Sequence, residues 1–131
     1  MPPVSWIAVI ASTVAAFVLG ALWYGPLFGK PWMREMGVDR SFKPRVARPV
    51  LFSLAIILNF VAALVFGAFV GPAPHVSLAL GAGAAVGLAW VAPSMVIAYL
   101  FADRSPRLAA IDAGYAVVQF ILFGPIFYML G

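Results

Sequence analysis

The chain has 131 residues, of which 65% are hydrophobic and only 9% are charged, and its net charge is +4. Soluble domains contain about 45–50% apolar and about 25% charged residues, so this composition excludes an ordinary soluble domain and indicates a membrane protein. The length predicts a single domain over residues 1–131. The sequence contains no cysteine, which excludes disulfides, thiolate catalysis and cysteine-based metal sites.

Four long apolar segments fill most of the chain, and each is long enough to cross a bilayer as a helix. Strands of a membrane barrel would be about half as long and would alternate apolar and polar residues, so we predict an all-α membrane protein. Pro93 should kink or tilt the third span, and Ser105 and Pro106 should start the fourth as its N-cap and first helical residue. The predicted spans are residues 4–22, 50–70, 76–101 and 108–130.

The basic residues occupy two stretches between these spans. Six of the eight lie between Lys30 and Arg48, and the other two are Arg104 and Arg107. The loop over residues 71–75 contains no lysine or arginine. Basic loops of multi-span proteins face the cytoplasm, so we expect both termini on the opposite side of the membrane. Anionic lipid headgroups, and not nucleic acid, are the expected counter-charge.

The first loop is the only sizeable polar part of the chain. Residues 31–36 are predicted to form a short interfacial helix that ends at Gly37. Its lipid-facing residues would be Trp32, Met33 and Met36, and its water-facing residues Arg34 and Glu35. The loop is either a lipid- or partner-recognition surface or a solvated connector that enforces topology, and we favour the connector. The expected interface and lipid anchors are Trp23, Tyr24, Trp32 and Arg34.

Small residues recur at four-residue spacing in all four predicted spans. Such stripes let helix backbones approach closely, and close packing drives helix association in lipid. The clearest stripe joins Gly83 and Gly87. The sequence leaves open whether this stripe meets a helix of the same chain or of a second copy. We expect a homo-oligomer, most simply a dimer in which an exposed Gly83–Gly87 stripe forms the seam, or association with another membrane protein.

Two segments repeat the pattern Gly-x-x-Trp-x-x-Pro at identical spacing, Gly20–Pro26 in the first span and Gly87–Pro93 in the third. Leu64–Gly67 and Ile121–Gly124 echo each other in the second and fourth spans. One interpretation is a duplicated helical hairpin, with two halves related by an axis along the membrane normal. The other is coincidence in an apolar chain of few residue types.

Asp112 is the only charged residue inside a predicted span. It lies six residues past Pro106, about 9 Å along the helix, and an ionisable group at such a depth is a candidate functional residue. Tyr115 and Gln119 share its helix face, and Asn59 lies at a similar mid-membrane depth in the second span. These residues form either a polar track for a proton, ion or polar substrate, or hydrogen bonds between helices.

Hydrogen bonding between helices is the favoured interpretation, with the Asp112 carboxylate reaching Arg104 or Arg107. Catalysis has little support. His75 is alone in a short loop, and no second histidine or paired intramembrane carboxylate completes a metal or acid–base site. We therefore expect no catalytic residues, no metal site and no cofactor.

One segment has a family resemblance. Gly20–Met33, with the sequence GALWYGPLFGKPWM, resembles the first-span signature of a bacterial four-span membrane family catalogued as domain of unknown function 1761. The resemblance extends to Asp112-Ala113-Gly114-Tyr115 and to the layout of nearly the whole chain. It implies a small multi-pass protein of the bacterial inner membrane and implies no activity. The positions that match the pattern are Trp23, Tyr24, Pro26, Trp32, Asp112 and Tyr115.

We therefore expect a non-enzymatic small integral membrane protein that self-associates or serves a larger membrane complex. The alternative is a small transporter or channel subunit that uses the polar track around Asp112. A cavity lined by Asp112, Tyr115, Gln119 and Asn59 would favour transport. Closely packed small-residue stripes without such a cavity would favour a scaffold.

Overall fold

A computed structural model describes residues 4–131, and every regular element within this range is a helix. The all-α prediction is confirmed. In chain order the elements are α1 (Trp6–Leu22), the π-helical segment η1 (Trp23–Leu27), α2 (Gly29–Met36), α3 (Arg48–Val70), α4 (Val76–Ala85), the π-helical segment η2 (Val86–Val91), α5 (Ala92–Phe101) and α6 (Pro106–Leu130).

Among residues 4–131, four continuous helices are long and apolar enough to cross a membrane. They are Trp6–Leu27, Arg48–Val70, Val76–Phe101 and Pro106–Leu130. The third has its predicted bounds, and the second and fourth each begin slightly earlier than predicted. The first extends through η1, beyond the predicted end at residue 22. The protein is therefore a multi-pass membrane protein.

The helix ends follow from local sequence. The Ser105 hydroxyl accepts hydrogen bonds from the backbone N–H groups of Arg107 (3.1 Å) and Leu108 (3.4 Å), which confirms the predicted N-cap of α6. Helix α2 ends at Gly37, whose φ of 72° places it in the left-handed region that glycine adopts without strain. The predicted short helix in the first loop is confirmed, and it begins at Gly29.

Both Gly-x-x-Trp-x-x-Pro segments contain a π-helical turn. Segment η1 contains Pro26, and η2 ends just before Pro93. Proline has no backbone N–H and clashes with the preceding turn, and a widened turn lets the helix continue past it. The backbone N–H of Phe28 accordingly donates to the carbonyl of Trp23 at 2.7 Å. The interruption expected at Pro93 is therefore a π-helical turn within a continuous span.

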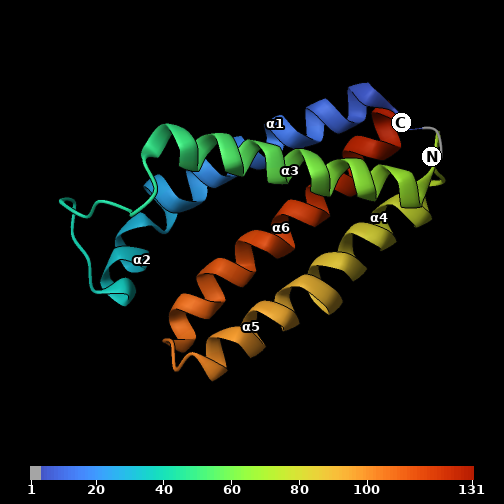
Figure 1. The fold of residues 1–131 in the computed structure, drawn as a ribbon. Helices are drawn as coiled ribbons and strands as arrows, with labels where there is room; N and C mark the ends of the chain where they lie inside the picture. The colour runs from blue at the N-terminus through green and yellow to red at the C-terminus, as the bar shows by residue number, and fades with distance from the viewer. Residues whose placement is uncertain (1–3) are drawn as a thin grey trace.

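Helix α6 lies at the centre of the bundle, with α1 on one side and α4 and α5 on the other (Figure 1). Helix α3 packs mainly against α1 and passes in front of it in Figure 1, with only slight contact to α4 and α6. In a symmetric pair of duplicated hairpins α3 and α6 would occupy equivalent places, and their packing here is not equivalent. The Ser5 hydroxyl donates to the carbonyl of Leu130 at 2.7 Å, so both ends of the described chain meet at the end opposite α2.

The small-residue stripes are packed inside the chain. A Cβ atom added at Gly87 would lie 3.0 Å from the backbone of Val117, and one at Gly83 would meet the Phe120 carbonyl. At Gly67 it would lie 2.6 Å from the ring of Phe127. The Gly83–Gly87 stripe therefore faces α6 of the same chain, and the expectation that it forms an exposed seam between two copies is wrong.

Candidate functional site around Asp112

The side chain of Asp112 joins three spans. Its Oδ1 accepts a hydrogen bond from the Tyr24 hydroxyl at 2.7 Å, and its Oδ2 accepts one from the Tyr99 hydroxyl. Tyr24 belongs to η1 and Tyr99 to α5, and only 9% of Asp112 is exposed. Burial of an ionisable group in a membrane is costly unless its charge is satisfied, and two phenolic donors satisfy both oxygens.

These partners differ from the predicted ones. The sequence suggested that Asp112 joins helices by a hydrogen bond to Arg104 or Arg107. In the structure the Arg104 guanidinium instead donates to the sulfur of Met36 at 3.4 Å. The reason is the rotation of α6, which turns Asp112 toward η1 and α5 and leaves both arginines exposed at its start.

The other predicted track residues bind different elements. The Tyr115 hydroxyl donates to the Ala16 carbonyl of α1 at 2.8 Å. The amide of Gln119 donates to the side-chain oxygen of Asn59 in α3 at 2.6 Å. Asp112, Tyr115 and Gln119 therefore each connect α6 to a neighbouring helix, which is the pattern expected of hydrogen bonds between helices.

Trp23 and Tyr24 turn toward α6. The indole N–H of Trp23 donates to the Ile111 carbonyl at 2.9 Å. Its ring occupies the space left by Gly114, where a Cβ atom would lie 3.0 Å from it. Both residues were expected to anchor the protein at the membrane interface, yet the polar atoms of both are engaged within the bundle. Arg34 is exposed.

The two segments that carry the family resemblance meet in space. Trp23 packs on Gly114, and Tyr24 binds Asp112. Gly20 lies against Tyr115, with its Cβ position 3.6 Å from the ring. These contacts explain why the two segments contain these residue types. Tyr24 needs the acceptor that Asp112 provides, and Trp23 needs the space that Gly114 leaves.

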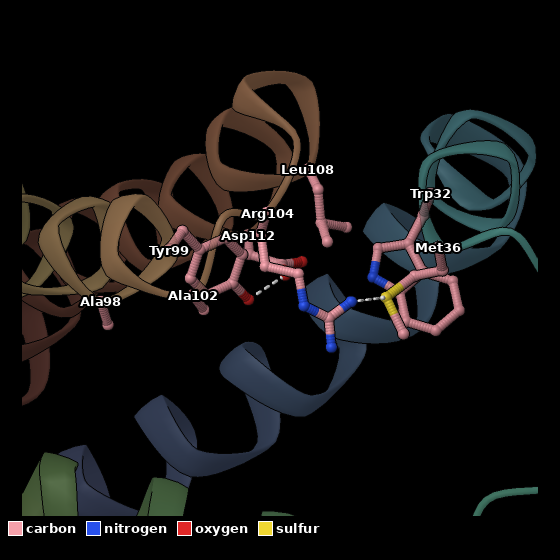
Figure 2. A pocket seen from close by; sticks show the side chains of 8 residues that line it. All are labelled: Trp32, Met36, Ala98, Tyr99, Ala102, Arg104, Leu108 and Asp112. Atoms are coloured by element: carbon pink, nitrogen blue, oxygen red, sulfur yellow. Dashed lines mark hydrogen bonds between the residues drawn. The ribbon is translucent and has the colours of Figure 1, made fainter.

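A pocket of about 330 Å³ opens beside Asp112, between α2, α5 and the start of α6 (Figure 2). Tyr99 and Asp112 lie together on one side of it, and the Arg104 side chain extends from there toward Met36 and Trp32. The pocket is lined by Trp32, Met36, Ala98, Tyr99, Ala102, Arg104, Leu108 and Asp112. Of the four predicted track residues, only Asp112 is part of this lining.

Helix α2 forms one wall of this pocket. The Ser105 hydroxyl donates to the Glu35 carboxylate, and Arg104 reaches Met36. The Trp32 ring also lies edge-on to Tyr24, with 6.1 Å between the ring centroids. Trp32 and Met36 were expected to face lipid and instead face the protein. Glu35 was expected to face water and instead binds Ser105, the N-cap of α6. Tyr99 was not predicted as a site residue, because it lies in an apolar span whose sequence does not show which face meets α6.

The residues described hold no group of three or more histidine, aspartate or glutamate side chains placed to bind a metal ion.

Comparison with known protein families identifies a match over nearly the whole chain. The family described as "Protein of unknown function (DUF1761)" matches residues 7–128, which include both resemblance segments. No curated protein and no solved structure matches the chain.

Proposed function

Since the chain belongs to the DUF1761 family, whose description assigns no activity, we propose from its structure that it is a non-enzymatic integral membrane protein that self-associates. The observation that carries this proposal is the second small-residue face of α4. Ser77, Gly81 and Ala85 recur at four-residue spacing and are exposed. Among the residues described, no other helix has an atom within 4 Å of the Cβ position of Gly81.

This face is suited to a second helix. Gly83 and Gly87 already show how closely a backbone packs on the opposite side of the same helix. Helix association in lipid relies on such close approach, because the lipid tails are as apolar as the side chains they replace. The exposed face of α4 offers the same approach to another copy, while the apolar remainder of the surface is matched to lipid.

The polar side chains within the spans support a structural role. Asp112, Gln119 and Tyr115 each have a partner on a neighbouring helix. Interhelical hydrogen bonds of this sort contribute about 0.6–2 kcal/mol each and fix the rotation of the helices they join. Both oxygens of Asp112 accept hydrogen bonds from tyrosines of other spans, which is the arrangement of a side chain that joins helices.

A substitution at Gly81 tests self-association. Gly81→Leu should convert the oligomer to a monomer without unfolding it, because the added side chain enters open space in the free protein. Gly81→Ala keeps a small side chain and is the matched control. The oligomeric state of the wild type and of both variants is measured by mass determination in mild detergent and by energy transfer between labelled copies in bilayers. A monomeric wild type, or an oligomer that Gly81→Leu leaves intact, would contradict the proposal.

The second candidate is a small transporter or channel subunit, which the presence of Asp112 in the pocket lining favours. In that case Asp112→Asn, which keeps the shape and removes the charge, should abolish a proton- or cation-coupled flux in proteoliposomes. Our proposal instead expects a loss of stability of about 1–3 kcal/mol and no flux to lose. A folded variant of unchanged stability that loses a measurable current would favour the transporter.

We also propose that the protein lies in the bacterial inner membrane with both termini outside the cytoplasm. The supporting observation is that α2 and the turn before Ser105 lie at one end of the bundle and the termini at the other. By charge, the end with α2 is the cytoplasmic one. Cysteines introduced at Ser41 and Ser77 should react with impermeant reagents from opposite sides, and labelling from one side only would refute this topology.

A further inference from the structure

The pocket beside Asp112 plays no part in the proposed self-association. It lies at the end of the spans where the chain turns from α5 into α6. Arg104 belongs to this turn, whereas Asp112 lies six residues past Pro106, about 9 Å further along α6. The pocket therefore has a cation at its outer edge and an acceptor at its inner end.

Arg104 has donors to spare. The side chain is exposed, and its hydrogen bond to the thioether of Met36 is to a weak acceptor. A guanidinium has five N–H donors in a planar fork that matches a phosphate group. The turn that carries Arg104 lies at the end of two spans, the depth at which lipid headgroups lie.

The walls between the two polar ends are mainly apolar. The apolar lining residues are Trp32, Met36, Ala98, Ala102 and Leu108. At the inner end, the carboxylate oxygens of Asp112 each hold one tyrosine hydroxyl. A carboxylate offers about four acceptor positions, so Asp112 still has capacity for a hydroxyl donor.

The volume and shape of the pocket suit such a ligand. The pocket holds about 330 Å³ and is open on one side, so it can take a glycerophosphate unit and the first carbons of a chain whose remainder extends outside. The complementary ligand has an anion outermost and a free hydroxyl further inward. It has a single apolar chain, because a second acyl chain would be esterified to that hydroxyl.

We propose that this pocket binds the glycerophosphate end of a single-chain phospholipid. The phosphate lies on the guanidinium of Arg104, and the free glycerol hydroxyl donates to the carboxylate of Asp112. The first carbons of the chain lie against Trp32 and Leu108, and the rest of the chain leaves through the open side of the pocket into the bilayer.

Native mass spectrometry of the full chain in maltoside micelles tests the site with three probes. Oleoyl lysophosphatidic acid has the proposed head and one chain, dioleoyl phosphatidic acid has a second chain in place of the free hydroxyl, and glycerol 3-phosphate has no chain. The lysolipid should bind about tenfold more tightly than either of the others. Equal binding of the diacyl lipid would overturn the single-chain assignment, and equal binding of glycerol 3-phosphate would overturn the lipid source.

Two arginines provide a matched pair of variants. Arg104→Gln should weaken lysolipid binding about tenfold, because it removes the charge-assisted hydrogen bonds to phosphate. Arg107→Gln removes the same charge from the first turn of α6, outside the pocket lining, and should change binding less than twofold. Equal losses in the two variants would indicate general attraction to a basic surface and would refute the pocket.

A third variant does not depend on charge. Ala102 is exposed and lines the pocket, so Ala102→Phe should narrow the pocket without disturbing the core. Lysolipid binding should fall about tenfold while the unfolding midpoint remains that of the wild type. Unchanged binding by Ala102→Phe would place the lysolipid elsewhere on the protein and contradict the proposal.

Discussion

The two Gly-x-x-Trp-x-x-Pro segments share their spacing and a π-helical turn, yet they contact α6 through different residues. In the first segment the tryptophan makes the contact, since the Trp23 indole binds the Ile111 carbonyl and its ring packs on Gly114. In the second segment Trp90 is 70% exposed and faces away from the bundle.

The glycines of the two segments show the reverse pattern. Gly87 lets its backbone approach α6 so closely that a Cβ atom would lie 3.0 Å from Val117. The corresponding Gly20 has an ordinary distance of 3.6 Å to the Tyr115 ring. Helix α6 is therefore held by an aromatic side chain on one side and by close backbone packing on the other. A repeated sequence here shares backbone geometry without sharing contacts.

The largest expected effect is at the tryptophans. Trp23→Ala should destabilise the protein by about 2–3 kcal/mol, somewhat below the cost of truncating a fully buried tryptophan, because Trp23 is half-buried. Trp90→Ala, the matched control, should change stability by less than about 0.5 kcal/mol because its ring is exposed. Reversible unfolding in mixed micelles measures both, and equal losses would mean that the two segments are equivalent.

A smaller effect is expected at the glycines, and here the second segment should be the more sensitive one. Gly87→Ala should cost about 1–2 kcal/mol, because the added methyl group meets the Val117 backbone, which cannot move aside as a flexible side chain would. Gly20→Ala should be neutral or stabilising by up to about 1 kcal/mol, since alanine favours the helix and has room beside Tyr115. The unfolding midpoints of the two variants measure this difference. A larger loss of stability in Gly20→Ala than in Gly87→Ala would contradict the conclusion that Gly87 makes the closer approach to α6.

Length and local chemistry made much of the fold predictable from sequence. Apolar runs of span length gave the four helices, and the signals at Gly37, Ser105 and Pro106 gave helix ends that the structure confirms. These features depend on residues close together in the chain. The π-helical turns were not predicted; an interruption was expected at Pro93 and none was expected at Pro26.

The site was less predictable, because helix rotation decides it. Asp112 stood out as an intramembrane charge, but the spans are apolar on all sides, so their sequences do not show which faces meet. The sequence therefore could not indicate the partners of Asp112. The expected partners were arginines close to it in the chain, and the observed ones are Tyr24 and Tyr99. The same limit applies to Gly83, whose stripe was expected to face a second copy and faces α6.

The first-span segment and the start of α6 are coupled through the hydrogen bond between Tyr24 and Asp112. A double-mutant cycle with Tyr24→Phe, Asp112→Ala and the combined variant measures this coupling by reversible unfolding in mixed micelles. We predict a coupling energy of about 1–2 kcal/mol, within the range for residues that share a hydrogen bond. Effects that add within about 0.3 kcal/mol would show that the two residues act independently and would contradict the account.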